Sequence, residues 1–245
     1  MLECVSVSKE FGGLQAVKNV DFVVKKNEIT GLVGPNGSGK STLLNVISGI
    51  YKPDSGKIVF LGEDISKLPP HLICSRGITK TSQTVQSFPD MTTLENVLVG
   101  AFFGRKAADK AEDPIEKAKS LLDFVGISKD KFNILARNLN VVELRRIQLA
   151  RALATTPKLL LLDELLTGLT PKESDEAIAL VKLIKKQGIT ILMVEHVMKV
   201  IMGLCDKVAV LHHGEKICEG TPGKVCTDEH VVKVYLGKKY SFNGD

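Results

Sequence analysis

The stretch GPNGSGKST has the residue types and spacing of a phosphate-binding loop. It fits the pattern G-x-x-x-x-G-K-[ST], with an apolar run expected to form a strand before it and an apolar-periodic segment expected to form a helix after it. Its glycines let the backbone turn N–H groups toward phosphate oxygens, Lys40 offers a positive charge to the outer phosphates, and Ser41 offers a hydroxyl to Mg²⁺. We call residues 34–42 the phosphate loop, and its candidate nucleotide-binding residues are Gly34, Pro35, Asn36, Gly37, Ser38, Gly39, Lys40, Ser41 and Thr42.

A second candidate is LLLLDE at positions 159–164. A run of leucines that ends in acids is typical of a buried parallel strand whose carboxyl end emerges at the edge of a sheet where ligands bind. Asp163 would face Mg²⁺, directly or through water, and Glu164 would polarise a water molecule against the last phosphate. Alone, two acids after a strand more often cap a helix. Beside the phosphate loop, the Mg²⁺ interpretation is favoured.

Three further residues carry weaker signals. His196 follows the apolar run ITILMVE and would surface at the same sheet edge, although a lone histidine there is more often structural. Gln83 lies in the polar stretch TKTSQTVQSFPD, where a glutamine usually faces solvent. Phe11, before Gly12 and Gly13, is by default a core aromatic.

The elements that must position these residues indicate an α/β fold. Short apolar runs with turn residues between them predict strands over the first sixty residues, interrupted by a helix over 41–50. Residues 92–155 have a helical texture. After them, two apolar runs, 159–164 and 188–196, flank a helix that ends near Gly188, and strand–helix–strand order indicates a parallel sheet.

Composition limits the class of protein. The 245 residues carry a modest net charge of +5, which gives little reason to expect a nucleic-acid partner. No apolar run approaches the ~20 residues needed to span a bilayer, and the start lacks a signal-peptide pattern, so a cytosolic chain is expected. The five cysteines show no metal-ligand or disulfide spacing, and we expect reduced thiols.

Taken in order, these motifs resemble those of the ATP-binding cassette ATPases over essentially the whole chain. Within that family, FGGLQAVKNV, EHVMKVIMGLCDKV and VVKVYLG are similar to the subunits that energise branched-chain amino acid import, and the lipopolysaccharide-export cassette has a similar end. The resemblance implies a P-loop NTPase fold: a RecA-like core with a mostly parallel sheet, an antiparallel β subdomain and an inserted helical subdomain. One domain, 1–245, would comprise the nucleotide-binding core (1–83), the helical subdomain (84–155) and the core continuation with its tail (156–245).

The resemblance also implies roles. Phe11 would stack on the adenine of ATP; Ser41, Gln83 and Asp163 would hold Mg²⁺, with Gln83 also reporting the nucleotide state to the membrane partner. Glu164 would be the general base, and His196 would brace the γ-phosphate and the attacking water. The expected partners are integral membrane permease subunits and a second cassette subunit, or a second copy of this chain. The protein would sit on the inner face of the membrane through the permease.

One stretch departs from the family pattern. The family signature, typically LSGGQ, aligns with residues 139–143, LNVVE, which we call the signature stretch. Asn140 has a different reach from the usual serine, Val142 adds a branched side chain, and Glu143 places a carboxylate toward the ATP of the facing subunit. Such a like-charge pair costs roughly 3 to 4 kcal/mol before screening. Leu165, in place of the usual proline after the acid pair, and Ser82, in place of an aromatic, are smaller departures.

Three hypotheses follow. The leading one is a transport ATPase subunit, weak alone, that works in an asymmetric heterodimer with a cassette that has an intact signature. The second is a nucleotide-gated subunit that closes on ATP but hardly hydrolyses it. The third is a cassette protein of translation or repair. Such proteins usually carry two cassettes in one chain or a long coiled-coil insertion, and neither is seen in this sequence.

Overall fold

A computed structural model describes residues 1–82, 87–104, 113–165 and 167–236 of the chain. The chain forms two compact units. The first unit consists of Met1–Leu68 with Thr190–Asp245, and the second of Pro69–Ile189. The subdomain boundaries expected at residues 83/84 and 155/156 do not coincide with the boundaries of these two units, and they stay a prediction.

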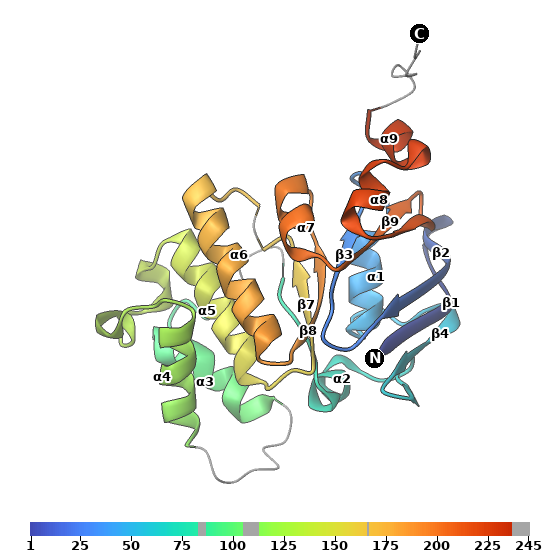
Figure 1. The fold of residues 1–245 in the computed structure, drawn as a ribbon. Helices are drawn as coiled ribbons and strands as arrows, with labels where there is room; N and C mark the ends of the chain where they lie inside the picture. The colour runs from blue at the N-terminus through green and yellow to red at the C-terminus, as the bar shows by residue number, and fades with distance from the viewer. Residues whose placement is uncertain (83–86, 105–112, 166, 237–245) are drawn as a thin grey trace. The chain divides into compact units, whose positions relative to one another are not determined.

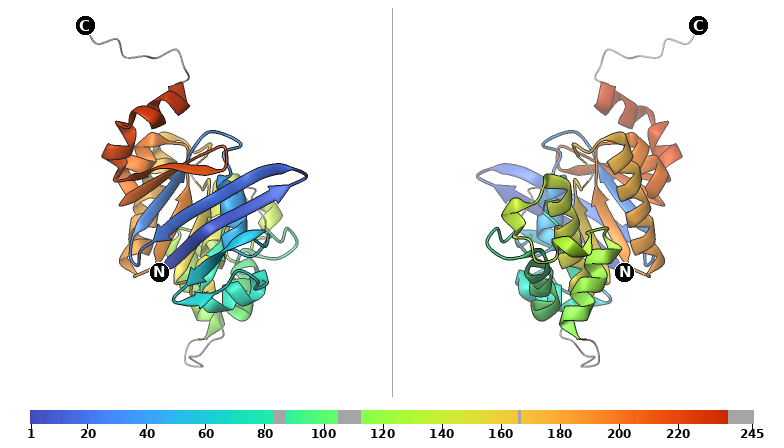
Figure 2. Two further views of the ribbon diagram at one scale, coloured as in Figure 1. Left: turned by 90° about the vertical axis from the view of Figure 1, so that its right-hand side faces the viewer. Right: turned by 90° about the vertical axis from the view of Figure 1, so that its left-hand side faces the viewer.

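An antiparallel sheet makes up one part of the first unit. Its strands are β1 (Leu2–Phe11), β2 (Leu14–Val24), β4 (Ser55–Phe60) and β5 (Glu63–Asp64), in the order β2-β1-β4-β5. The long strands β1 and β2 pair along their length and form an extended ribbon, drawn in dark blue in Figure 2. Leu2, Cys4 and Val7 of β1 are buried, so that one side of the ribbon contributes to the core.

The first unit also holds a mostly parallel group of strands. These are β3 (Ile29–Val33), β8 (Thr190–Val194), β9 (Lys207–His212) and β10 (Glu215–Gly220), in the order β10-β9-β3-β8. Strand β3 is parallel to both β8 and β9, and every residue of β3 and β8 is buried, as expected of strands covered on both faces. The helices of this unit are α1 (Lys40–Ile47), α7 (Met198–Leu204), α8 (Pro222–Cys226) and α9 (Glu229–Leu236).

The second unit is mainly helical. Its helices α3 (Thr93–Phe103), α4 (Pro114–Phe124) and α5 (Val141–Ala154) pack against one another (Figure 1). The parallel strands β6 (Ile78–Lys80) and β7 (Leu159–Asp163) bring residues 78–80 level with residues 159–161. The unit is completed by α2 (Pro70–Arg76), α6 (Pro171–Lys186) and the 3₁₀ turns η1 (Lys129–Lys131) and η2 (Ala136–Asn138).

The expected α/β fold class is confirmed. The apolar runs 159–164 and 188–196 form β7 and β8, and the helix between them, α6, is followed by Gly188 with φ of 84°. Within the helical segment expected over residues 92–155, α4 begins at Pro114, while residues 105–112 lie outside the described residues.

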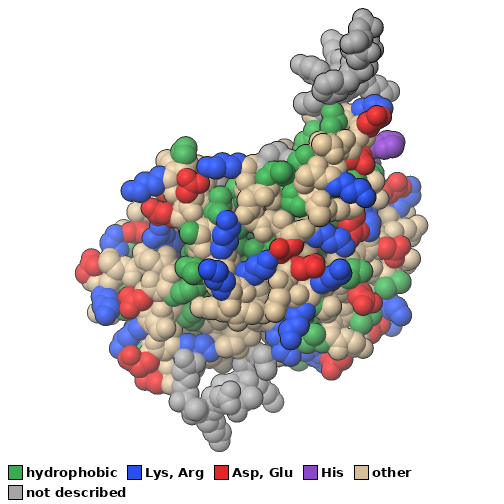
Figure 3. Space-filling model, viewed as in Figure 1, with side chains coloured by type: hydrophobic (Ala, Val, Ile, Leu, Met, Phe, Trp, Pro, Cys, Tyr) green, Lys and Arg blue, Asp and Glu red, His purple; other side chains and the backbone are tan. Residues whose placement is uncertain are grey.

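The surface carries both signs of charge. On the face in Figure 3, lysine and arginine side chains are interspersed with aspartate and glutamate, so that this face has no extended region of one sign. Within the described parts of the chain, no helix is long and apolar enough to cross a bilayer.

Candidate nucleotide-binding site

The phosphate loop connects β3 to α1 in the first unit, and its glycines have conformations that side chains disfavour. Gly34, Gly37 and Gly39 have φ values of 149°, 77° and 102°. A Cβ atom on Gly34 would lie 2.1 Å from the carbonyl oxygen of Leu211, and one on Gly39 would lie 2.2 Å from that of Ala16. The backbone is therefore packed into a shape that only glycine permits, with its N–H groups at the amino end of α1, and this arrangement fits a phosphate group.

Lys40 completes the phosphate loop from within. Its side chain is buried, with a residue exposure of 5%, and its Nζ donates to the carbonyl oxygens of Gly34 and Pro35, both at 2.9 Å. The hydroxyl of Ser38 lies 3.4 Å from the same nitrogen. A phosphate bound in the loop would place negative charge beside this buried ammonium.

His196 emerges beside the phosphate loop. Strands β3 and β8 are parallel, and Leu32 lies opposite Val194 in their register. Because the carboxyl ends of parallel strands meet at one edge, the segment after Val33 and the segment after Val194 leave the sheet together. The first unit thus brings the phosphate loop and the segment that contains His196 to the same edge of the sheet.

Phe11 is available to a ligand. It lies at the end of β1, and 41% of the residue is exposed, so it is not the core aromatic that its surroundings in the sequence suggest by default. Its ring meets Tyr51 edge-on, with centroids 5.0 Å apart, and Lys9 Nζ lies 5.3 Å from its centroid. A partly exposed ring held by two neighbours can stack on another flat group.

Tyr235, on α9, was missed by the sequence reasoning. Burial raises the pKa of its phenol, and a hydrogen bond from the backbone of Gly34 opposes that shift. Tyr235 and Val33 also line one apolar cavity of about 320 Å³. The last described helix therefore touches the beginning of the phosphate loop, and nothing in the local sequence around either residue signals that contact.

The second unit holds the acid pair. Asp163 ends β7 with only 3% of its side chain exposed, and its Oδ2 lies 3.0 Å from Nζ of Lys80 on β6. Glu164 follows with φ of 51°, a left-handed conformation that a glutamate rarely adopts. Strain of this kind gathers at functional sites and supports a chemical role for Glu164. The predicted residue Gln83 lies outside the described residues.

The signature stretch forms a regular helix entry. Asn140 caps α5: its Oδ1 accepts from the N–H of Glu143 at 2.9 Å, and Oε2 of Glu143 accepts from the N–H of Asn140 at 3.0 Å. Glu143 also pairs with Lys131. Burial alone would raise the pKa of Glu143, but the hydrogen bonds from Lys131 and Asn140 outweigh burial and lower that pKa. The carboxylate is therefore neutralised within its own unit.

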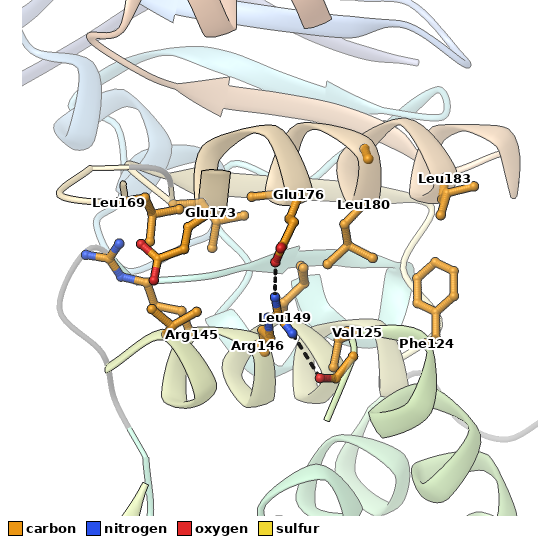
Figure 4. A pocket seen from close by; sticks show the side chains of 15 residues that line it. Phe124, Val125, Arg145, Arg146, Leu149, Leu169, Glu173, Glu176, Leu180 and Leu183 are labelled. Carbon is orange, nitrogen blue, oxygen red and sulfur yellow. Dashed lines mark hydrogen bonds and ion pairs between the residues drawn. The ribbon is translucent and has the colours of Figure 1, made fainter. Parts of the chain in front are cut away.

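The loop after the acid pair leads into α6. Leu165 is buried, Gly168 has φ of 76°, and Thr170 caps α6 in a capping box with Glu173. Figure 4 shows the groove between α5 and α6, where Arg146 donates to Glu176 at 2.7 Å and to the carbonyl oxygen of Gly126 at 2.9 Å. These contacts connect the helix of the signature stretch to α6.

Comparisons with known proteins give the family. A family model described as ABC transporter matches residues 17–167, and a model described as Branched-chain amino acid ATP-binding cassette transporter matches residues 215–241. The chain belongs to the ATP-binding cassette (ABC) transporter family, as an ATP-binding subunit.

Similar proteins align with nearly the whole length of this chain. The high-affinity branched-chain amino acid transport ATP-binding protein BraF of Pseudomonas aeruginosa is 36% identical over 97% of this chain and 98% of its own. LivG of Escherichia coli, which has the same description, is 35% identical over 97% and 98%. A nucleotide-free ATP-binding cassette from an ABC transporter superposes with a TM-score of 0.87 at 33% identity, covering 97% of this chain and 99% of that one. A dimeric bacterial ABC transporter cassette superposes with a TM-score of 0.81 at 27% identity, covering 91% and 99%.

Proposed function

We propose that this chain binds MgATP and hydrolyses it to energise the import of branched-chain amino acids through an integral membrane permease, on whose cytoplasmic side it is held. The observation that carries the nucleotide proposal is the glycine-built phosphate loop with the buried ammonium of Lys40 inside it. The choice of transported solute rests on the names of the similar proteins and on the match over residues 215–241.

The residues divide the work by their chemistry. The phosphate loop and Lys40 bind the phosphates. Ser41, Asp163 and Gln83 offer the oxygen ligands that Mg²⁺ prefers, and a bound Mg²⁺ would neutralise part of the phosphate charge. Glu164 accepts the proton of the attacking water, His196 braces the last phosphate, and Phe11 stacks on the base. The strained backbone of Glu164 and the exposed ring of Phe11 support these assignments.

We further propose a partner cassette with an intact signature in place of a second copy of this chain. In the signature stretch, the N–H groups of Asn140 and Glu143 are already accepted by each other's side chains. Two donors at the amino end of α5 are therefore not offered to an incoming phosphate. The site that includes this chain's phosphate loop and Glu164 would be the hydrolytic one.

The same capping box favours a second candidate, a nucleotide-gated subunit that closes on ATP and hardly hydrolyses it. The two candidates differ in turnover. In the reconstituted complex, the first predicts phosphate release that Glu164→Gln abolishes, while the second predicts one ATP bound per chain with little release before or after that change.

A multiple variant tests the signature stretch directly: Asn140→Ser, Val141→Gly, Val142→Gly and Glu143→Gln together. If this stretch faces an ATP molecule, the variant complex should hydrolyse ATP about tenfold faster, since the N–H donors at the amino end of α5 become available to the phosphate. Unchanged turnover would contradict an ATP facing this stretch. Equal turnover by the isolated chain and by the complex would contradict the heterodimer.

Uptake of radiolabelled leucine tests the solute. Cells whose chain carries Lys40→Ala should lose energised uptake of leucine, isoleucine and valine while keeping uptake of an unrelated amino acid. Unchanged branched-chain uptake would contradict this transport assignment and direct attention to export.

A further inference from the structure

The ring of Phe11, at the end of β1, is held by the loop that follows α1. This loop, residues 48–54, joins α1 to β4 within the first unit. The ring of its Tyr51 meets the Phe11 ring edge-on, with centroids 5.0 Å apart and planes at 71°. Its Asp54 pairs with Lys9, whose Nζ lies over the Phe11 ring at 5.3 Å from the centroid. One aromatic and one cationic side chain therefore hold the ring, and both depend on this loop.

The backbone of the loop is fixed at two points. The N–H of Tyr51 donates to the carbonyl oxygen of Asn45, in the last turn of α1, at 3.2 Å. The N–H of Asp54 donates to the carbonyl oxygen of Ser8 on β1 at 2.9 Å, where β1 and β4 begin to pair. Because these hydrogen bonds fix the backbone on both sides of the loop, Tyr51 and Asp54 present their side chains to β1 from defined places.

Asp54 in turn fixes the cation over the ring. Its Oδ1 lies 2.6 Å from Nζ of Lys9, and only 15% of the Lys9 side chain is exposed. Its Oδ2 accepts from the N–H of Glu10, the residue before Phe11, at 2.7 Å. The hydrogen bonds from Lys9 and Glu10 hold the pKa of Asp54 below its usual value, so this carboxylate is charged at neutral pH. One carboxylate thus anchors both the ammonium over the ring and the backbone that leads into Phe11.

A ring held in this way is prepared for stacking. Contacts with a second ring and with a cation are both favourable, and both restrict the side-chain torsions of Phe11. At the same time 41% of Phe11 is exposed, so part of its surface remains open to a ligand. A side chain that is already ordered loses little conformational entropy when a ligand stacks on it. A freely rotating Phe11 would therefore bind a base more weakly through the same contact area.

We propose that Tyr51 and Lys9 are positioning residues that hold the Phe11 ring for stacking on the base of the nucleotide. The inference rests on the proposed function, in which Phe11 stacks on the base. It adds two residues that set the base-dependent part of the affinity, each of them through Phe11. The phosphate loop would bind the triphosphate group equally well with or without their contacts to the ring.

The test measures the base-dependent part of the affinity on the full chain. Calorimetry with Mg²⁺ gives the Kd for ATP and for inorganic triphosphate, which lacks a base, and we call the ratio of the second to the first the base preference. Tyr51→Leu removes the aromatic contact and keeps an apolar side chain. It should lower the base preference about threefold, with the Kd for triphosphate changed by less than about twofold.

Two further variants serve as controls for Tyr51→Leu. Tyr51→Phe keeps the ring and should keep the wild-type base preference. Ile50→Ala changes the neighbouring residue, which is 53% exposed, and should also leave the base preference unchanged. An unchanged base preference in Tyr51→Leu, or an equal loss in Ile50→Ala, would overturn the proposal.

Lys9→Met tests the cation independently and keeps the test decisive if Tyr51→Leu does not fold. It removes the ammonium from the ring and keeps most of the side chain, and it should lower the base preference about twofold. Lys57→Met, at an exposed position of β4 in the same sheet, is the matched control for the lost charge and should leave the base preference unchanged. Equal effects of the two changes would overturn the role assigned to Lys9.

A double-mutant cycle shows whether both residues act through the ring. In the Phe11→Ala background, Tyr51→Leu and Lys9→Met should cause no further loss of base preference, because the ring that they hold is gone. Losses that add to the loss caused by Phe11→Ala would overturn the proposal. A wild-type chain with no base preference, or a base preference that Phe11→Ala leaves unchanged, would instead contradict the stacking role of Phe11 in the proposed function.

Discussion

Lys80 Nζ lies 3.0 Å from Asp163 Oδ2, and the two side chains are only 12% and 3% exposed. They come from the neighbouring parallel strands β6 and β7, and they form an ion pair almost out of contact with water. The acid proposed to hold Mg²⁺ thus has a positive partner supplied by its own unit. Because both side chains are largely buried, removing either charge would leave the other charge buried without this partner, which is energetically costly.

Removing the cation of this pair should destabilise the protein. We expect Lys80→Met to lower the free energy of unfolding by about 3 to 5 kcal/mol, because it leaves the carboxylate of Asp163 buried without this charge. Lys80→Arg should keep most of the stability. Urea denaturation measures both, and Lys233→Met, in an exposed pair with Glu229, is the control at no more than about 1 kcal/mol. Equal losses at Lys80 and Lys233 would contradict the buried pair.

The phosphate loop should not tolerate a side chain at Gly39. Its φ is 102°, and a Cβ would lie 2.2 Å from the carbonyl oxygen of Ala16, whereas Gly188 has φ of 84° with no atom within 4 Å of its Cβ position. Gly188→Ala should therefore cost about 1 kcal/mol from backbone strain alone. Gly39→Ala should cost about 1 to 3 kcal/mol more and should abolish ATP binding, measured by calorimetry. Full ATP binding by Gly39→Ala would show that the loop relaxes freely.

The ring of Phe11 should contribute to nucleotide affinity. Stacking of an aromatic ring is worth about 0.5 to 1.5 kcal/mol, so Phe11→Ala should raise the Kd for ATP about threefold to tenfold. Leu14→Ala is a matched control, since Leu14 begins the next strand and is 71% exposed. Inorganic triphosphate, which lacks a base, should bind both variants alike. A similar loss with triphosphate would point to the backbone and not to the ring.

Glu164 should be needed for turnover but not for binding. Removal of a general base slows a reaction about 10²- to 10⁴-fold, so Glu164→Gln should lose phosphate release to that extent in the complex while a fluorescent ATP analogue still binds. Glu229→Gln, on an exposed helix end, provides the comparison. Turnover within a factor of about two of wild type would remove Glu164 from the mechanism.

The contribution of Glu143 should depend on pH. Its pKa in the folded protein is lower than the ordinary 4.5, so its charged form stabilises the fold above pH 4.5 and the contribution is lost as the pH falls through the lowered pKa. At neutral pH we expect Glu143→Gln to destabilise the protein by about 1 kcal/mol, and we expect the difference from wild type to shrink in acid.

A double-mutant cycle with Lys131→Met tests whether the contribution of Glu143 comes from its pair with Lys131. Because Lys131 pairs with Glu143, the loss caused by Glu143→Gln should be smaller in the Lys131→Met background. A constant difference across the acid range, or full additivity with Lys131→Met, would contradict the role assigned to this pair.

Local sequence determined a large part of the fold. The phosphate loop could be found from its letters because its conformation depends on glycines a few residues apart, and β7 and β8 could be found because strands buried on both faces must be continuously apolar. The parallel order of β3 and β8 then explains why His196 reaches the edge where the phosphate loop begins. The helix entry at Asn140 was equally local, since its capping box joins residues three apart.

Contacts between distant parts of the chain could be decided only by tertiary structure. The sequence left Phe11 as a core aromatic by default, and its exposure follows from where β1 ends. It gave no sign that Lys80 faces Asp163, that Lys131 neutralises Glu143, or that Tyr235 touches Gly34. Each of these contacts joins elements whose separation in space is set by packing, and the local residue pattern specifies the type of an element but not its neighbours. The sequence by itself therefore determined the class of chemistry, and the tertiary structure decided which charges are paired and which side chains remain for a ligand.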